Sequence, residues 1–373
     1  MKQIALLFEF GSLNGGEHSM LAMLQQLHGR SFEFTAFCLA DSPLQQRLTS
    51  LNIPCHPVQF HDEQGLRLPR EAVLEQLLPV LQSQHFDLLH ANSLSMARLT
   101  GAFAEQLPVP CSGHLRDIIK LSRAAIRDLN RNRRLFAVSH ATREFHIARG
   151  LNAETVSVCY NGVDCERFHP RPATGALKQE LGLPADTRLC LTIGQIGLRK
   201  GQDVLAEAAR MLAEQGDQQT HFVLVGERHS QKQESIDFDH ALDTTFAQPE
   251  LAGRLHRLGY RDDIPYLMNE VDLLVHPAKQ EPLGRVLLEA IASGLPLVAT
   301  DVGGTCEIVD HERSALLVPP NEAAALASAI QRLLHDQSLS QSISQHARRR
   351  AEERFTSERA SRNMEACWQE LCD

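Results

Sequence analysis

Short apolar runs alternate with longer amphipathic stretches along the whole chain, and this alternation limits the fold more than any other feature. In the first half, strands are predicted at Ile4–Phe8, Phe34–Cys38, Leu88–His90, Leu135–Val138 and Val156–Tyr160. Helical periodicity covers the segments between them, for example Arg70–Gln84 and Ser95–Gln106. Buried strands that alternate with amphipathic helices are typical of a parallel sheet with helices on both faces.

The alternation restarts after a proline-containing connector, Asp164-Cys-Glu-Arg-Phe-His-Pro-Arg-Pro172, because prolines favour extended backbone. Further strands are predicted at Leu189–Ile193, Phe222–Val225, Leu273–His276 and Leu297–Ala299. A chain of 373 residues is long enough for two domains. We therefore predict an α/β protein of two doubly wound, Rossmann-like domains, residues 1–168 and 169–355, that face each other across a cleft. We expect a C-terminal helix, residues 356–373, to pack back on the first domain.

The composition is that of a soluble globular protein, with 43% hydrophobic residues. No apolar run approaches the roughly 18 residues that span a bilayer, and Glu9 interrupts the apolar start, which we interpret as a buried strand. A net charge of -9 argues against DNA as a partner. Nine scattered cysteines without a C-x-x-C pair indicate a reducing compartment. We expect a cytoplasmic protein, with peripheral attachment to the membrane surface as an alternative.

One glycine-rich loop has the properties of a phosphate site. The segment Gly194-Gln-Ile-Gly-Leu-Arg-Lys-Gly201 follows a predicted strand and opens a helix at Gln202–Leu212. Ligands bind at the carboxyl ends of strands in doubly wound sheets. Glycine permits close backbone approach, and the helix start, with Arg199 and Lys200, supplies positive charge. The loop suits a diphosphate, and it also fits an ordinary turn between a strand and a helix.

A second motif, Glu281-Pro-Leu-Gly-Arg-Val-Leu-Leu-Glu289, follows the strand Leu273–His276. Pro282 suits the first turn of a helix, and two glutamates eight residues apart would lie on one side of it. The alternative is a helix with one acid favoured by its dipole and another on a solvated face. Two further glycine turns follow predicted strands, at Asp301–Thr305 and Gly11–His18.

Taken in order, these motifs resemble glycosyltransferase family 4. The resemblance rests on Gly15-Gly16, Asn161–Phe168, Lys200-Gly201, Glu281-x7-Glu289 and Gly303-Gly304, and its most specific part is Leu273–Pro319. Members of this family are retaining transferases of the GT-B fold. The resemblance therefore implies a hexosyltransferase that takes its sugar from a nucleotide diphosphate sugar, such as a UDP- or GDP-sugar, without an essential metal or other cofactor. The acceptor, the sugar and the base stay open.

The resemblance also implies roles for residues on the side of the sugar donor. Glu281 would bind hydroxyls of the transferred sugar, with the backbone N–H groups of Leu283 and Gly284 near its oxygens or the β-phosphate. Glu289 would hold the ribose hydroxyls. Lys200 would neutralise the charge that grows on the diphosphate as the glycosidic bond breaks.

Three further positions bear on donor binding. The resemblance implies that Gly15 and Gly16, in the glycine turn near the start, contact the sugar donor. The family usually has arginine where this chain has Gln195, and a neutral amide cannot replace a guanidinium fork on phosphate. We expect either that Arg199 compensates or that the phosphates are bound more weakly.

On the acceptor side, the resemblance implies that His114 contacts the transferred sugar near its reacting carbon. The alternative is a histidine in a polar loop at the end of a strand. Asp117 is a weaker candidate for accepting the acceptor's proton, which the leaving diphosphate could also take. No pair of carboxylates suits the scheme of a glycoside hydrolase.

A basic segment follows His114. Six cations recur every three or four residues, which predicts one positively charged helical face: Arg116, Lys120, Arg123, Arg127, Arg131 and Arg134. We interpret the face as a site for an anionic acceptor, phosphorylated or at a membrane surface, with Arg116, Asp117, Lys120 and Arg123 nearest to it. The alternative is a solvated helix face.

Two rival functions fit the same architecture. A sugar-nucleotide epimerase shares two such domains and a nucleotide sugar ligand, but it lacks the Glu-x7-Glu arrangement. A non-catalytic protein that binds nucleotide sugars is the second rival, and Gln195 is the residue that favours it. Asp262-Asp263 precedes a predicted helix and is better explained by capping than by metal binding.

Overall fold

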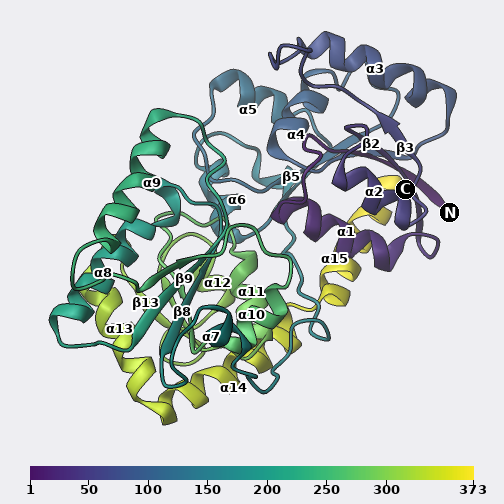
Figure 1. Ribbon diagram of the computed structural model, residues 1–373. Helices are drawn as coiled ribbons and strands as arrows, with labels where there is room; N and C mark the ends of the chain where they lie inside the picture. Colours follow the sequence, from purple (N-terminus) through teal and green to yellow (C-terminus); the bar gives the residue numbers. More distant parts are fainter. The chain divides into compact units, whose positions relative to one another are not determined.

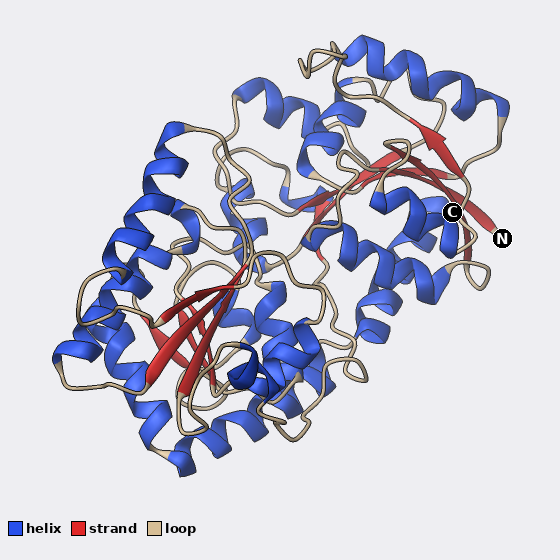
Figure 2. Cartoon of the chain, viewed as in Figure 1, coloured by secondary structure: helices blue, strands red, loops and turns tan.

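The computed structural model describes residues 1–373, and the chain forms two compact α/β domains (Figure 1). The N-terminal domain comprises Met1–Gly162 with Ser357–Asp373, and the C-terminal domain comprises Val163–Thr356. Each contains one parallel sheet with helices packed against it (Figure 2), which confirms the predicted fold class of two Rossmann-like domains. None of the helices combines the length and the apolar character that a membrane span requires.

The N-terminal sheet has seven strands in the order β3-β2-β1-β4-β5-β6-β7. Its strands are β1 (Lys2–Leu7), β2 (Phe32–Cys38), β3 (Cys55–Pro57), β4 (Leu88–Ala91), β5 (Cys111–Leu115), β6 (Arg134–Ala137) and β7 (Val156–Val158). Its helices are α1 (Gly15–Leu27), α2 (Pro43–Ser50), α3 (Arg70–Ser83), α4 (Leu94–Ala102), α5 (Arg123–Leu129), α6 (His140–Ile147), the short η1 (Ala153–Thr155) and α15 (Ser357–Cys372). The order reverses between β1 and β4, so ligands are expected at the carboxyl ends of these two strands.

Strand β1 shows why this sheet needs helices on both faces. Its side chains alternate between two cores, with Ala5 and Leu7 in one and Ile4 and Leu6 in the other, because successive side chains of a strand point to opposite faces. Helix α15, from the end of the chain, covers the second core and buries Trp368 completely against Phe32 and Phe34. The last helix is thus part of the N-terminal domain.

The C-terminal sheet has six parallel strands in the order β10-β9-β8-β11-β12-β13. They are β8 (Arg188–Ile193), β9 (Thr220–Val225), β10 (Leu255–Arg257), β11 (Leu273–His276), β12 (Leu297–Thr300) and β13 (Leu316–Val318). The helices are α7 (Ala176–Glu180), η2 (Leu198–Lys200), α8 (Gln202–Glu214), α9 (Gln233–Phe246), α10 (Ile264–Glu270), α11 (Arg285–Ala292), α12 (Thr305–Ile308), α13 (Ala323–His335) and α14 (Gln337–Arg354). Here the order reverses between β8 and β11.

The predicted basic helix of residues 116–134 is wrong. Helix α5 covers only Arg123–Leu129, and its start is fixed by Ser122, whose side chain accepts a hydrogen bond from the backbone N–H of Ala125. Arg116 lies in the loop before it and Arg134 in strand β6. The cations therefore do not share one face, because a cap and a strand interrupt the helical period that their spacing suggested.

Candidate functional site

Two loops meet where the strand order of the C-terminal sheet reverses. The first follows β8 and carries Lys200 in η2; the second follows β11 and carries Glu281. Gly201, at φ +69°, lies between η2 and α8, and a Cβ atom there would stand 1.8 Å from the carbonyl oxygen of Pro277. The loops thus pack backbone against backbone, which only glycine allows.

Lys200, Glu281 and His276 form a buried cluster between these loops. Nζ of Lys200 lies 2.6 Å from Oε2 of Glu281, and Nε2 of His276 lies 3.0 Å from the same oxygen. The exposed fractions of the side chains are 15% for Lys200, 9% for Glu281 and 3% for His276. One carboxylate oxygen thus joins a cation and an imidazole at the carboxyl ends of β8 and β11.

The electrostatics of the cluster define its protonation states. Burial alone would raise the pKa of Glu281, but the charge of Lys200 and the hydrogen bond from His276 outweigh it and hold this pKa well below its usual range. Burial, with Lys200 and Arg199 nearby, lowers the pKa of His276 in spite of Glu281. At neutral pH the carboxylate is therefore ionised, and a neutral His276 donates to it through Nε2.

The structure places Glu281 in a loop, not in the first turn of a helix as the sequence suggested. Helix α11 begins only at Arg285, after Gly284 at φ +101°. The loop is fixed from a third side, because the backbone N–H of Gly304, after β12, donates to the carbonyl oxygen of Glu281. Leu283, at the same bend, is 2% exposed. The rigidity of this bend, and not a helix, thus positions the carboxylate.

Glu289 lies on α11 and is buried, with 8% of its side chain exposed. Its Oε1 pairs with the guanidinium of Arg285, one turn earlier, at 2.7 Å. Burial raises the pKa of Glu289, which Arg285 and Arg167 offset only in part. The two glutamates of the motif therefore differ: the surroundings of Glu281 favour the carboxylate, whereas burial shifts the pKa of Glu289 towards the neutral acid.

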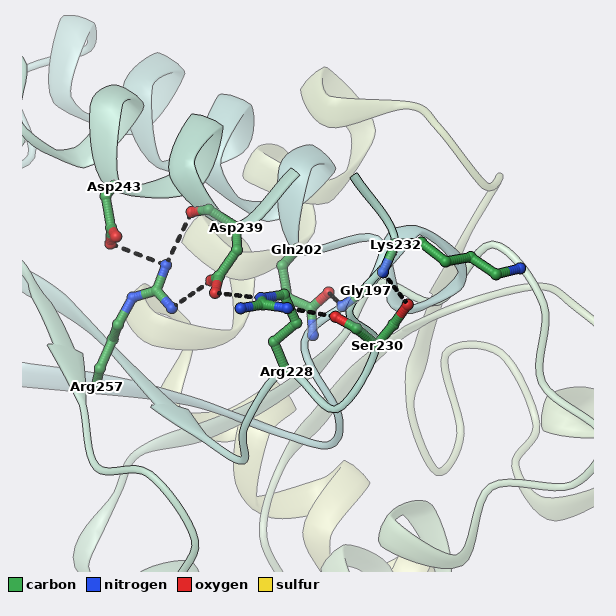
Figure 3. A network of polar contacts seen from close by, with 8 residues as sticks. All are labelled: Gly197, Gln202, Arg228, Ser230, Lys232, Asp239, Asp243 and Arg257. Carbon is green, nitrogen blue, oxygen red and sulfur yellow. Dashed lines mark hydrogen bonds and ion pairs between the residues drawn. The ribbon is translucent and has the colours of Figure 1, made fainter. Parts of the chain in front are cut away.

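The loop after β8 is held from within by one side chain. Oε1 of Gln202 accepts from the backbone N–H of Gly197 (Figure 3). Its Nε2 donates to the carbonyl oxygen of Gln195. Gln195 and Arg199 are both exposed. The loop therefore has an ordered backbone and presents one amide and one guanidinium at its surface.

The loop after β9 is anchored by an alternating network of charges (Figure 3). Asp239, on α9, pairs with Arg228 in this loop at 3.3 Å and with Arg257 at the end of β10 at 2.7 Å, and Arg257 also pairs with Asp243 at 2.8 Å. Tyr260, after β10, is 65% exposed. This side of the C-terminal sheet thus offers a fixed loop beside an exposed aromatic ring.

In the N-terminal domain, His114 lies within strand β5 and not in a loop, and it is completely buried. Its Nδ1 lies 2.8 Å from Nε2 of His90, while Nδ1 of His90 contacts Ser112 at 2.8 Å and Nε1 of Trp368 at 3.4 Å. The indole can only donate. Nδ1 of His90 is then an acceptor, and the remaining proton of His114 resides on Nε2, a buried atom without a hydrogen-bond partner.

Arg116 is half-buried and binds protein groups. It donates to the carbonyl and side-chain oxygens of Asn92 at 3.1 and 2.9 Å and to the side chain of Asn161 at 3.1 Å. Burial lowers its pKa to about 10 in spite of nearby Glu17. A Cβ atom on Gly16 would approach the Arg116 side chain to 3.0 Å. Arg116 thus joins the segments after β4 and β7 and lies against the first turn of α1.

The other predicted residues of this domain are at the surface. Gly15, Asp117, Lys120 and Arg123 are all exposed. The carbonyl oxygen of Asp117 accepts a hydrogen bond from Nε2 of His146 at 2.8 Å. The roles expected for these residues stay predictions.

His276 was not singled out from the sequence. It ends strand β11, five residues before Glu281, and a histidine in the last position of an apolar strand was the available signal. No group of three or more His, Cys, Asp or Glu side chains is arranged to hold a metal ion. The expected independence from metals stays a prediction.

Family comparisons cover both domains. The model of Glycosyltransferase Family 4 matches residues 13–167, and the model of Glycosyl transferases group 1 matches residues 174–350. The chain thus consists of the two domains of a glycosyltransferase. The resemblance inferred from the motifs is thereby confirmed, and so is the assignment as an enzyme that transfers sugars.

Relatives of this glycosyltransferase act on diverse molecules. The UDP-Gal:alpha-D-GlcNAc-diphosphoundecaprenol alpha-1,3-galactosyltransferase of Escherichia coli is 24% identical over 88% of this chain and 86% of its own. The N-acetyl-alpha-D-glucosaminyl L-malate synthase of Bacillus anthracis is 25% identical over 90% of this chain and 88% of its own. The crystal structure of HepE from Anabaena in complex with UDP-glucose is 26% identical, with a TM-score of 0.87 over 99% of this chain and 100% of that chain. The domains of this glycosyltransferase are thus those of the GT-B fold.

Proposed function

We propose that this glycosyltransferase moves a hexose from a UDP-sugar to an acceptor hydroxyl with retention of anomeric configuration. The observation that carries the proposal is the buried cluster of Lys200, Glu281 and His276 where the strand order reverses. The choice of UDP is supported by HepE, which was crystallised with UDP-glucose. The sugar is proposed only as a class.

In this proposal Glu281 orients the transferred sugar. Its pKa lies well below the usual range, so it is ionised at neutral pH, accepts hydrogen bonds from sugar hydroxyls without taking their protons, and is a weak base. Lys200, already 2.6 Å from this carboxylate, balances the negative charge that develops on the leaving diphosphate. A fixed charge in a buried site stabilises such a transition state without reorganisation.

The diphosphate would lie over the loops after β8 and β11. Arg199 supplies a second cation there, and the starts of α8 and α11 supply positive dipole potential. We propose that these groups balance the diphosphate without a metal, and that Glu289 holds the ribose. The base would lie beside the anchored loop after β9 and the exposed ring of Tyr260.

The proposed step breaks the bond between the anomeric carbon and the β-phosphate oxygen. The acceptor oxygen forms the new bond on the face from which the phosphate leaves, and the acceptor proton passes to the leaving phosphate oxygen. Glu281 is too acidic to serve as the base, which supports the phosphate in that role. His114 is completely buried and its Nε2–H has no partner, so the contact with the transferred sugar that the resemblance implies would require this atom to become exposed when the donor binds.

The test is slow hydrolysis of the sugar donor in the absence of acceptor. The protein is incubated with UDP-glucose, UDP-galactose, UDP-N-acetylglucosamine and GDP-mannose, and free nucleotide and epimerised sugar are measured separately. We expect release of UDP from at least one UDP-sugar, and no change in rate when EDTA is added. Formation of an epimer without release would support the epimerase instead.

The variant Glu281→Gln assigns the activity to the cluster. It leaves Lys200 without its carboxylate and the sugar without its acceptor group, so we expect UDP release to fall by about 100-fold or more. The matched control is Glu234→Gln, an exposed glutamate on α9 of the same domain, which should leave the rate unchanged. Equal rates for wild type and Glu281→Gln would contradict the proposed site.

A further inference from the structure

A cavity of about 390 Å³ opens in the N-terminal domain, away from the residues that the family motifs identify. Its wall comes from the segment after β3, the start of α3 and the first two turns of α4. Three arginines line it: Arg67, Arg70 and Arg98. Its size is in the range of pockets that hold small ligands. We call it the arginine cavity.

Two of the three arginines are paired with carboxylates of the domain. Arg67 lies 2.9 Å from Oε1 of Glu9, after β1, and Arg70 lies 2.9 Å from Oδ2 of Asp128, on α5. Arg67 also donates to the hydroxyl of Ser95 at 2.8 Å. These contacts fix two guanidinium groups in place at the wall.

Arg98 has no such partner. Its guanidinium group forms no ion pair or hydrogen bond, and its Nε atom is buried without an acceptor. Burial, and then the charges of Arg70 and Arg67, lower its pKa. Three cations and two carboxylates leave one positive charge unbalanced beside the cavity. A buried donor without an acceptor is costly unless a ligand supplies the acceptor.

We propose that the arginine cavity binds a phosphate ester group of the acceptor substrate. The inference rests on the proposed function in one respect only, that the bound molecule is the acceptor. Guanidinium groups bind phosphate oxygens in a bidentate manner, and several donors can share the three free oxygens of a phosphomonoester. A planar carboxylate offers only two oxygens and would leave more of the arginine N–H donors without an acceptor.

The place of the cavity in the fold favours a substrate. Glu9 and Ser93 are hydrogen bonded to each other at the carboxyl ends of β1 and β4, where the strand order of this sheet reverses. Through Arg67, which contacts Glu9 at 2.9 Å, the cavity is joined to that edge, the usual place for ligands. A phosphate there would hold an acceptor beside the edge where the chemistry is expected.

The rest of the wall indicates what accompanies the phosphate. Half of the cavity is apolar, formed by Phe60, Leu68, Pro69, Val73, Met96 and Leu99. A phosphate bound at Arg98 would have its carbon skeleton against this surface. The shared chemistry is a phosphate ester with a partly apolar body, free in solution or at the head of a lipid.

Calorimetric titration of the full-length protein with glycerol 3-phosphate tests the proposal. We expect saturable binding to the wild type, and a dissociation constant about tenfold or more higher for Arg98→Gln, because a charge-assisted contact is lost. Arg98→Lys keeps the charge but not the fork and should lie between the two. The matched control is Arg47→Gln, an exposed arginine on α2 of the same domain, which should bind like the wild type.

Thermal unfolding separates binding from folding. Without phosphate, Arg98→Gln should melt close to the wild type, since the substitution removes the burial of a charge and the repulsion from Arg70 and Arg67 together with the attraction to Asp128 and Glu9. With glycerol 3-phosphate, the melting temperature of the wild type should rise and that of Arg98→Gln should not. Equal effects of chloride at the same ionic strength would show screening of charge and would overturn the proposal.

Vesicles distinguish the two sources of the phosphate. If the ester belongs to a lipid, the protein should sediment with phosphatidic acid vesicles and Arg98→Gln should do so less. If it belongs to a soluble molecule, only glycerol 3-phosphate should show the dependence on Arg98. The proposal fails if neither depends on Arg98. Binding of UDP-glucose is measured separately, so its absence would refute the proposed function while leaving the phosphate result interpretable.

Discussion

The two domains share one topology, but their buried charges are organised in opposite ways. Where the strand order of the C-terminal sheet reverses, Lys200 and Glu281 are matched at 2.6 Å, and His276 donates to the same carboxylate. In the N-terminal domain, Arg98 and His114 each have a buried nitrogen without a partner. The cluster at the edge of the C-terminal sheet is thus fully paired, whereas these two side chains of the N-terminal domain lack an acceptor.

The proposed function accounts for this difference by what each site would recognise. A nucleotide diphosphate sugar has the same diphosphate in every member of the family, so its site can be built around fixed backbone and matched charges. Acceptors differ among the relatives, which include a galactosyltransferase for a diphosphoundecaprenol-linked sugar and an N-acetyl-alpha-D-glucosaminyl L-malate synthase. Of the two unpaired groups, Arg98 at the arginine cavity is therefore where the identity of the acceptor should be sought.

The largest effect should come from disrupting the backbone contact between the loop that carries Lys200 and the loop that carries Glu281. In Gly201→Ala, the new Cβ would stand 1.8 Å from the carbonyl oxygen of Pro277 at a residue with φ +69°. We expect the C-terminal domain to lose about 3 kcal/mol or more of its free energy of unfolding. Urea unfolding followed by circular dichroism measures the loss.

Gly197→Ala is the matched control, four residues away in the same loop. A Cβ there would meet nothing within 4 Å, and φ of 169° is extended backbone that any residue adopts. We expect a change within about 0.5 kcal/mol. If the two variants were equally stable, the loops after β8 and β11 would not be packed as described.

The sequence predicted the C-terminal site better than the N-terminal one, for a physical reason. The strands that precede Lys200 and Glu281 are mostly apolar, and β11 was predicted at its observed bounds, Leu273–His276. Strand β5 was missed because Cys-Ser-Gly-His-Leu has small and polar residues, and only the neighbouring strands make it buried.

The arginine cavity shows a second limit of prediction from the sequence. Arg67, Arg70 and Arg98 lie on three elements and have no periodicity in common. The basic run of residues 116–134 has such a periodicity, but a cap at Ser122 and the strand β6 divide it. Spacing predicts a charged surface only where one element continues through it, and a cavity between elements is visible only in three dimensions.

An intermediate effect should appear in the acid stability of the N-terminal domain. Burial lowers the pKa of His90 to about 3 and that of His114 well below 6.5. Both stay neutral in the folded state while the unfolded chain binds protons below pH 6.5, so stability falls as pH decreases from there. Each such histidine adds up to about 1.4 kcal/mol per pH unit to that slope.

The variant His114→Gln removes one of these contributions, and we expect a shallower loss of stability between pH 6.5 and 5. Trp368, the only tryptophan, is buried in this domain, so its fluorescence in urea reports the domain directly. The control is His61→Gln, at an exposed histidine. A slope unchanged in His114→Gln would mean that this histidine is protonated in the folded state.

The smallest effect concerns the exposed residues of the loop after β8, where this chain has Gln195 in place of the arginine that is usual in the family. Gln195 and Arg199 are both exposed, and solvent weakens each contact with phosphate. If Arg199 compensates, Arg199→Gln should weaken UDP binding by about threefold to tenfold, and Gln195→Arg should strengthen it by a similar factor. The double variant should then restore the wild-type affinity measured by calorimetry. An unchanged affinity in Arg199→Gln would instead mean that Lys200 and the backbone of the loop bind the phosphates without the exposed side chains. The donor site would then consist only of buried, paired groups, which would sharpen the contrast between the two domains.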